Sequence, residues 1–295
     1  MRNKLFNRIL LTLTAIVVVI TAAACDGSSS LGGFIQLGKY ENASNYAVGN
    51  AEYSATGITS VSVHWSVGQV KIVRSGDDRI YLTESGDGAL PEAKRIRSLV
   101  IGEKLDIRFW ASELKDTVDE IDKFLTLSIP ENLTLFVETS AAEIRFDDEF
   151  DLTTVDVKTS SGKICANAIK TNSFSATSSS GDINIVTLTA DATSITTSSG
   201  NATISSLSAG SLRTVTSSGN TAIGLVGLTT GNATSSSGKI TLSAPSGLGL
   251  TVIFSSSSGK LTYDSKTYLG GKFDFNGGGA VLNVNTSSGN LIVNP

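Results

Sequence analysis

The sequence predicts an all-β protein whose C-terminal half is a parallel β-solenoid, a β-helix-like stack of repeats of about 19 residues. Three observations predict this class. Ser-Ser-Gly recurs at a fixed spacing, apolar and polar residues alternate around each of these glycines, and the chain is rich in Ser, Thr, Gly and Asn, which are poor helix formers. The net charge of −4 and the recurring Val, Ile and Leu argue against disorder, and the pI of about 5.1 argues against a general nucleic-acid binder.

The repeat is marked by the glycine of each Ser-Ser-Gly. Successive glycines are 19 residues apart over the first four intervals, then 21 and 30 apart, which places insertions in the last two units. A bias toward Ser and Gly does not produce such a constant spacing, so the register indicates a repeated structural unit. The seven glycines are Gly162, Gly181, Gly200, Gly219, Gly238, Gly259 and Gly289.

Each unit is expected to form a strand, a tight corner, a second strand and a turn. Around Gly181, Phe174, Ala176, Ile183 and Ile185 alternate with polar neighbours, which is the period of half-buried strands. We expect the corner glycine to adopt a positive φ and the polar residue after it to line a solvated edge. One unit buries too little apolar surface to fold alone, so we expect parallel rungs about 4.8 Å apart, each resting on its neighbour in sequence. An antiparallel sandwich of hairpins is the alternative, but the fixed spacing favours the solenoid.

The region before the regular repeat is expected to be a degenerate β-repeat that caps the stack. This capping region covers residues 40–150, and the regular solenoid covers 151–295. We expect the insertion at 265–280 to cover the last rungs. The elements expected in the capping region are worn corners at 66–68 and at Ala142, a hairpin that turns at 102–103, a short helix over 113–124, and strands over 125–129 and 133–137.

The N-terminus is typical of a secretory signal. Residues 1–24 combine a basic start, a short apolar run and small residues, and Cys25 follows directly, which resembles a bacterial lipobox. Residues 25–39 are then a lipidated N-terminus and a flexible tether rich in Gly and Ser. Cys25 is the predicted lipidation site, and two acyl chains would hold the protein on the extracytoplasmic side of the bacterial cell membrane. An ordinary cleaved signal and an uncleaved anchor are the alternatives, although the apolar run is shorter than the ~20 residues that span a bilayer.

Candidate chemistry is sparse, and we predict no catalytic, cofactor-binding or metal-binding residue. Asp182 and Asp191 stand at different places in the repeat, so no rung holds a pair of carboxylates. His64 is the one histidine and is expected on the polar face of a strand. Cys165 is expected to be a free, partly exposed thiol with a structural role, and Trp65 is expected in the core.

An acidic run precedes the regular repeat. Asp147, Asp148, Glu149 and Asp151 are expected on a solvated loop, with weak calcium binding as the alternative. The calcium-binding nonapeptide of other β-helices is absent from the sequence, so the solvated loop is favoured.

Three segments resemble the DUF4097 family. They are ITSVSVHWSVGQVKIVRSGDDRIYLTE at 58–84, LTLSIPENLTLFVETSAAEI at 125–144, and the repeated TSSG that closes with NTSSGNLIV at 285–293. The resemblance covers roughly residues 40–295. It implies a β-strand-repeat protein of the cell envelope, of a kind also described as adhesins, and it supplies no catalytic residues.

These observations together predict a non-enzymatic cell-surface lipoprotein with a structural, adhesive or envelope-sensing role. Its expected partners are the membrane, through the lipid anchor, and cell-wall polysaccharide or another envelope protein, but not nucleic acid. One alternative is an enzyme acting on envelope glycans. The other is an ordered Thr/Ser array, including Thr159, Thr197 and Thr216, that binds a regular surface such as polysaccharide or ice.

Overall fold

The computed structural model describes residues 39–86, 88–114 and 123–294, all within one compact unit. These residues form strands and two short 3-10 helices, η1 (Ala43–Asn45) and η2 (Glu92–Lys94). The strands are β1 (Ala47–Val48), β2 (Ala51–Ser54), β3 (Ser60–Trp65), β4 (Gln69–Arg74), β5 (Arg79–Gly86), β6 (Arg97–Ile101), β7 (Lys104–Arg108), β8 (Lys123–Ile129), β9 (Thr134–Thr139), β10 (Glu143–Thr159), β11 (Ile164–Ser178), β12 (Ile183–Thr197), β13 (Ala202–Thr216), β14 (Thr221–Ser235), β15 (Ile240–Ser243), β16 (Leu250–Ser256), β17 (Leu261–Tyr263), β18 (Lys266–Tyr268), β19 (Gly271–Phe275), β20 (Ala280–Thr286) and β21 (Leu291–Asn294).

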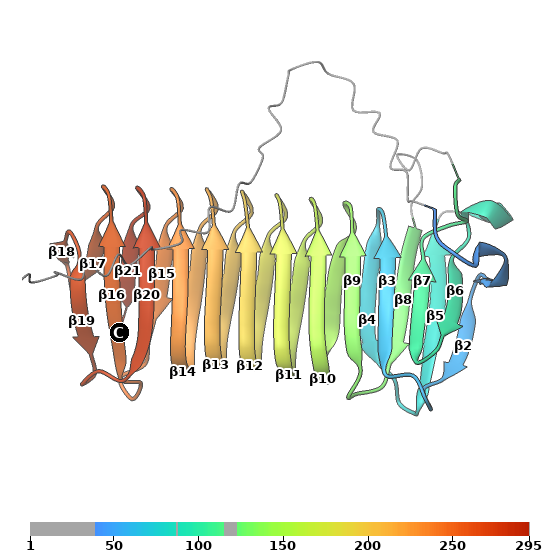
Figure 1. Cartoon of the computed structure of the whole chain (residues 1–295), viewed down its shortest axis with the longest axis horizontal. Helices are drawn as coiled ribbons and strands as arrows, with labels where there is room; N and C mark the ends of the chain where they lie inside the picture. Colours follow the sequence, from blue (N-terminus) through green and yellow to red (C-terminus); the bar gives the residue numbers. More distant parts are fainter. Residues whose placement is uncertain (1–38, 87, 115–122, 295) are drawn as a thin grey trace, which may run out of the picture. The chain divides into compact units, whose positions relative to one another are not determined.

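The predicted parallel solenoid is confirmed in the central coils. Strands β10 to β14 pair in parallel with their neighbours, and the register advances by one repeat at each step, so that Ile164 lies beside Ile183 and Ile183 beside Ala202. Each of these long strands bends in the middle, and its two halves contribute to two opposite faces of the stack (Figure 1). The Ser-Ser-Gly corners therefore line up along one edge.

The core lies between these two faces. In β12, Ile183, Ile185, Leu188 and Ile195 are buried, as are the smaller Ala190 and Thr193, while the remaining residues between them face outward. The same inward positions are filled in each coil, so apolar side chains stack on one another along the solenoid. This arrangement gives each coil the apolar contacts that it lacks alone.

The glycine at each corner is needed for close approach rather than for backbone conformation. None of the seven repeat glycines has a positive φ, so that expectation was wrong. A Cβ on Gly181 would lie 1.8 Å from the carbonyl oxygen of Gly162, and a Cβ on Gly200 would lie 2.1 Å from that of Gly181. Because the corners stack backbone against backbone, only glycine fits at this position.

A second inward column sits beside the corner. Thr159, Thr197 and Thr216 have exposed fractions of 6%, 2% and 2%, so these threonines cannot form the surface-binding array considered as an alternative. Three residues before each glycine, the strand still points this side chain into the stack. The hydroxyls of Thr197 and Thr216 donate to the carbonyl oxygens of Gly200 and Gly219 at 2.9 and 3.0 Å, which satisfies buried polar groups at the bend.

The capping region continues the stack in a different chain order. The worn corners at 66–68 and at Ala142 are confirmed, because β3 and β4 stack in parallel on β9 and β10. β7 and β8 then stack on the other side of β3 and β4. The expected hairpin at 102–103 joins β6 and β7. The antiparallel strands β5, β6, β2 and β1 finish this end.

The last two Ser-Ser-Gly units are stacked in reverse order. β20 pairs with β14 on one side and with β16 on the other, and β21 likewise lies between β15 and β17. The coil with Gly289 is thus inserted between the coils of Gly238 and Gly259, so the expectation that each unit rests on its sequence neighbour was wrong here. The insertion at 265–280 does cover the final coil, since β18 and β19 pair antiparallel with β17 and β16.

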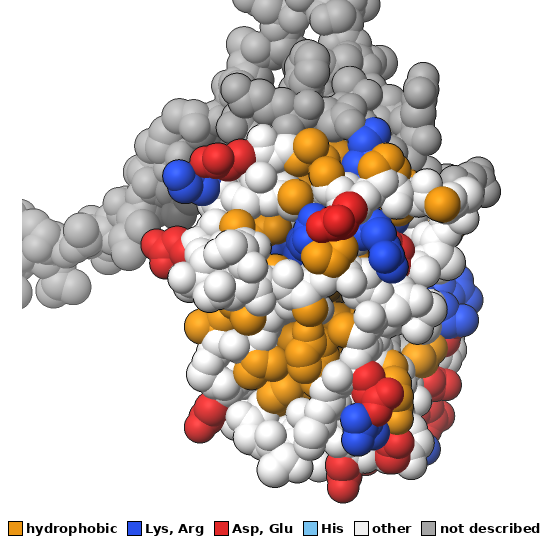
Figure 2. Space-filling model, turned by 90° about the vertical axis from the view of Figure 1, so that its right-hand side faces the viewer, with side chains coloured by type: hydrophobic (Ala, Val, Ile, Leu, Met, Phe, Trp, Pro, Cys, Tyr) orange, Lys and Arg blue, Asp and Glu red, His pale blue; other side chains and the backbone are white. Residues whose placement is uncertain are grey.

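Both ends of the stack present short strands. β1 has 2 residues, β2 has 4 and β18 has 3, and such short edges limit pairing with other chains. Figure 2 faces the end that carries β2, β5 and β6 and shows hydrophobic side chains gathered in its middle, with charged side chains around them. Ala51 and Tyr53 of β2 pack against the core at this end.

The expected short helix and the expected N-terminal signal fall mostly on residues that the structure does not describe. The expected helix over 113–124 falls mostly on residues 115–122, which lie outside the described residues, and Lys123 already begins β8. The predicted signal peptide and the lipidation site Cys25 also lie outside them. In the part of the chain that the structure describes, no helix has the length and apolar character to cross a bilayer.

Candidate functional site

The first candidate surface is a polar ladder on the corner edge. The residue after each repeat glycine faces solvent, as expected, and in four consecutive coils these residues are Asp182, Asn201, Asn220 and Lys239. The first three of these side chains each accept a hydrogen bond from the backbone of the next coil. Asp182 Oδ1 accepts from Asn201 N at 2.8 Å, Asn201 Oδ1 accepts from Asn220 N at 3.0 Å, and Asn220 Oδ1 accepts from Lys239 N at 3.0 Å.

The ladder leaves polar groups available to a ligand. Amide groups of Asn201 and Asn220 repeat from coil to coil and point the same way, because each is fixed by the coil below it. A shallow groove of about 410 Å³ runs beside them, and its outward-facing floor includes Asn184, Thr203 and Thr241. We call the ladder and this groove the polar ladder face. It carries regularly repeated donors and acceptors, with one carboxylate, Asp182, and one ammonium, Lys239.

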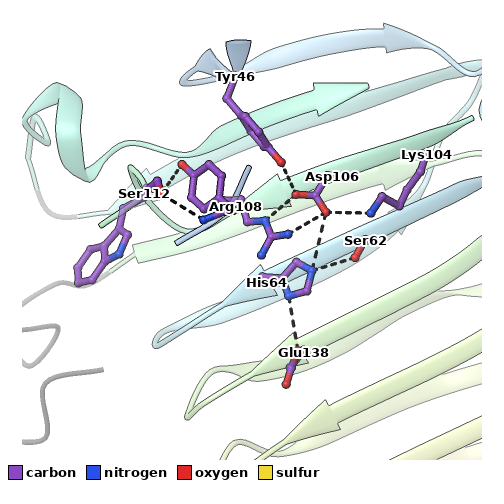
Figure 3. A network of polar contacts seen from close by, with 10 residues as sticks. Tyr46, Ser62, His64, Lys104, Asp106, Arg108, Ser112 and Glu138 are labelled. Atoms are coloured by element: carbon purple, nitrogen blue, oxygen red, sulfur yellow. Dashed lines mark hydrogen bonds and ion pairs between the residues drawn. The ribbon is translucent and has the colours of Figure 1, made fainter. Parts of the chain in front are cut away.

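The second candidate site is a network around Asp106, on the outer side of β7 (Figure 3). Asp106 is fully buried, although alternation with the core residues Leu105 and Ile107 places it on the outer face. Its carboxylate accepts a hydrogen bond from Tyr46 Oη at 2.7 Å and two from the Arg108 guanidinium. Lys104 lies 3.5 Å away.

The network fixes the N-terminal segment of the described chain. Tyr46 covers Asp106, and the Tyr40 ring packs against Tyr46 with centroids 4.8 Å apart. Tyr40 Oη donates to the carbonyl oxygen of Trp110 at 2.9 Å, and the Arg108 guanidinium lies over the Tyr40 ring. Residues 40–46 are therefore held on the solenoid by Asp106 and Arg108.

The pKa values follow from this burial and pairing. Burial and the hydrogen bond to Asp106 raise the pKa of Tyr46 to about 12. Burial alone would raise the pKa of Asp106, but the bonds from Arg108 and Tyr46 and the Arg108 charge outweigh it, so this pKa is below its usual value. Burial and then the Arg108 charge lower the pKa of His64. Asp106 is thus ionised and His64 neutral near pH 7.

His64 stands between a hydroxyl and a carboxylate. Its Nε2 is 3.1 Å from Ser62 Oγ, and its Nδ1 is 3.5 Å from Glu138 Oε2, which is the order of a serine hydrolase triad. Among the described residues, however, the backbone donors of β3 cannot form an oxyanion hole, because β3 pairs on both sides, with β7 and β9, and its N–H groups are used in those ladders. Ser62 is also buried, so a substrate carbonyl cannot reach its hydroxyl. This geometry supports a structural role for His64.

The lowered pKa of His64 makes stability depend on pH. The groups facing His64 are Arg108, Lys104, Asp106 and Glu138. The unfolded chain binds more protons than the folded one between the lowered pKa and the ordinary value of about 6.5, so the free energy of unfolding should fall as the pH falls through that window. We expect His64→Gln to flatten this slope, measured by urea unfolding at about pH 7 and about pH 5. An unchanged slope in the variant would contradict this origin of the pH dependence.

The structure separates the acidic residues considered as catalytic or metal-binding. Asp182 lies on the corner edge, whereas Asp191 lies at the opposite bend of the coil. The acidic run lies within β10 rather than on a loop, at a bulge between Phe146 and Glu149, which corrects the expectation. Asp147 pairs with Lys71 at 2.7 Å. Within residues 39–86, 88–114 and 123–294, no group of three His, Cys, Asp or Glu side chains is placed to hold a metal ion.

Other expected positions are confirmed. Trp65 is buried in the core, and Cys165 is a free, partly exposed thiol whose pKa is raised by burial and by the charge of Glu143. The sequence analysis did not identify Asp106 or Lys123 as buried charged residues. Lys123 carries a usable signal, since it shares the inward parity of Leu125, Leu127 and Ile129 in β8. Asp106 has none, because its burial depends on Tyr46 from a distant segment.

Three solved structures are similar to this chain at low sequence identity. A Bacteroides fragilis structure described as a "putative adhesin" is 12% identical, covers 84% of this chain and 97% of its own, and has a TM-score of 0.49. One from Parabacteroides distasonis with the same description is 13% identical, with the same coverage and TM-score. A Clostridium sporogenes "putative cell adhesion protein" is 10% identical over 84% of this chain and 99% of its own, with a TM-score of 0.30. A search of curated proteins finds no match. The model of the Toastrack DUF4097 family matches residues 58–294, and the chain therefore belongs to that family.

Proposed function

We propose that this protein is a non-enzymatic, lipid-anchored surface protein that adheres to envelope polysaccharide through its polar ladder face. The observation that carries the proposal is the unbroken series of outward-facing side chains from Asp182 to Asn220, each bonded to the backbone of the next coil. The anchor is Cys25, acylated as the first residue of the mature chain and facing the extracytoplasmic side of the membrane. Mass spectrometry of the N-terminal peptide from native membranes checks the anchor, and an unmodified Cys25 would remove it from the proposal.

The repeat of the ladder suits a polymer with a repeated unit. Sugar hydroxyls both donate and accept hydrogen bonds. Asn201 and Asn220 each keep a second amide N–H for such a hydroxyl, and Asn220 Oδ1 keeps a second lone pair. The backbone bonds hold these amides in place before a ligand arrives, so binding costs little side-chain entropy. Several weak contacts along one chain can then add up to useful avidity.

Binding to isolated wall polysaccharide tests the proposal. We expect the double variant Asn201→Ala/Asn220→Ala to bind about tenfold more weakly or worse, because each lost hydrogen bond is worth ~1 kcal/mol. The measurement is a pull-down with the full-length protein over a range of polysaccharide concentrations.

A matched control lies on the opposite face of the stack, in the coil of β12. Ser194 and Thr196 face outward there and are partly exposed, so Ser194→Ala/Thr196→Ala should bind as the wild type does. Equal binding by both double variants, with unchanged thermal unfolding, would place the ligand elsewhere. Retention of an envelope protein in place of polysaccharide would also overturn the proposed partner.

A further inference from the structure

A buried lysine and glutamate face each other near the N-terminal end of the stack. Lys123 opens β8 and Glu84 lies in the neighbouring strand β5, where Gly86 is opposite Lys123 and Glu84 is opposite Leu125. The two side chains are therefore diagonal neighbours on one face of the sheet. Lys123 Nζ is 2.8 Å from Glu84 Oε1, and their side chains are 0% and 7% exposed.

The amine is buried between two aromatic rings and two backbone carbonyls. Lys123 Nζ lies over the rings of Trp65 and Phe109, 4.9 and 4.3 Å from their centroids. It donates to the carbonyl oxygens of Lys94, at 2.7 Å, and of Phe109. Two of the three ammonium N–H groups are thus used, and the third can point to Glu84.

This environment raises the share of neutral amine above that of an exposed lysine. Burial lowers the pKa of Lys123 to about 8, and the bond to Glu84 only partly offsets the effect. A proton passed from the ammonium to the carboxylate leaves an uncharged amine beside an uncharged carboxylic acid, which is the reactive form of both groups.

We propose that Lys123 Nζ and Glu84 Cδ condense to an intramolecular amide. The ammonium first gives one proton to the carboxylate, and the nitrogen lone pair then attacks Cδ. The C–N bond forms, the bond from Cδ to Oε2 breaks, and Oε2 leaves as water with a second proton from the nitrogen. No oxidant, reductant or further reactant is needed.

Two neighbouring groups are placed to assist this step. Ile96 N donates to Glu84 Oε1 at 2.8 Å, so it would stabilise negative charge on that oxygen in the tetrahedral intermediate. The Arg95 guanidinium lies 3.6 Å from Oε2, beside the leaving oxygen. The small exposed fraction of Glu84 gives the released water a way out.

The amide would tie together strands that carry the capping region. It joins β5 to β8, the strand through which β5 and β2 attach to the rest of the stack. Such a bond closes the chain between residues 84 and 123, which restricts the unfolded state and should slow unfolding of this end.

Mass spectrometry of the full-length wild-type protein tests the proposal directly. We expect its intact mass to be lower than the sequence mass by one water, after allowance for N-terminal processing. Trypsin cannot cut after an amidated lysine, so the digest should contain peptide 80–94 joined to peptide 116–145. Recovery of peptide 80–94 alone, with cleavage after Lys123, would overturn the proposal.

The same digest holds an internal control. Lys170 and Asp151 also form a close ion pair, at 2.5 Å, but both are exposed, so trypsin should still cut after Lys170. The variants Lys123→Arg and Glu84→Ala should both have their full sequence masses. Because the deciding measurement is on the wild type, it does not depend on whether these variants fold.

Discussion

Gly200→Ala is expected to lower the free energy of unfolding by about 3 kcal/mol, the upper part of the range for inserting a methyl group where no space exists. The added Cβ would stand 2.1 Å from the carbonyl oxygen and 2.7 Å from the carbonyl carbon of Gly181. Both are backbone atoms of the neighbouring coil, so relief requires the two coils to move apart. That movement weakens the parallel ladders on both faces. Urea unfolding followed by circular dichroism measures the change.

An open glycine provides the control. Gly247 has no atom within 4 Å of its would-be Cβ and has no positive φ, so Gly247→Ala should be neutral or stabilise by up to about 1 kcal/mol through the unfolded state. Ser199 is exposed beside Gly200, and Ser199→Ala should change stability by no more than about 0.5 kcal/mol. Equal effects of Gly200→Ala and Gly247→Ala would show that corner packing does not require glycine.

Ending the chain after Gly279 is expected to abolish stable folding of the C-terminal coils. The deletion removes β20 and β21, which separate β16 and β17 from the rest of the stack. It also removes Leu282, Val284, Leu291 and Val293, which are buried and together stabilise the fold by roughly 6–12 kcal/mol. That amount is comparable with the ~5–15 kcal/mol that holds a domain folded. Limited proteolysis should cut within 244–279 in the truncated protein and not in the full chain.

A point substitution in β20 should have a smaller effect on stability than the truncation. Leu282→Ala leaves the coil order intact and should cost about 2–5 kcal/mol, as other large-to-small core changes do. Leu282 fills the space beside Gly231 in the neighbouring coil, since a Cβ on Gly231 would lie 2.7 Å from Leu282 Cδ1. Protease resistance of 244–279 after the truncation would contradict the inserted position of the last coil.

The central coils could be predicted from the sequence because the same pattern of glycine spacing and apolar alternation recurs in each of them. The constant spacing of Gly162, Gly181 and Gly200 fixes which coil meets which, and the alternation around each glycine fixes which side chains point inward. Parity also explains the error over Thr197. The sequence places Thr197 in a polar column, whereas its position three residues before the glycine turns it inward, where its hydroxyl satisfies a buried carbonyl.

The stacking order at the ends could not be predicted, since it depends on contacts between distant segments. No local pattern shows that the unit of Gly289 stacks before the unit of Gly259, because both orders use the same corner and the same alternation. The role of the corner glycine also needed coordinates, since conformational freedom and lack of space both select glycine. In the candidate sites, the polar column after each glycine was visible, whereas the pairing of Asp106 with Tyr46 was not.

The inserted last coil confines changes in repeat number to the middle of the molecule. At each end, the order of the coils in the stack differs from their order in the chain. A repeat added after the last strand would therefore follow an internal coil and would have no exposed coil to stack on. Between Gly162 and Gly238, by contrast, both faces of every coil meet an equivalent neighbour. Gene duplication or loss of one 19-residue segment there would lengthen or shorten the stack by about 4.8 Å without disturbing either terminus.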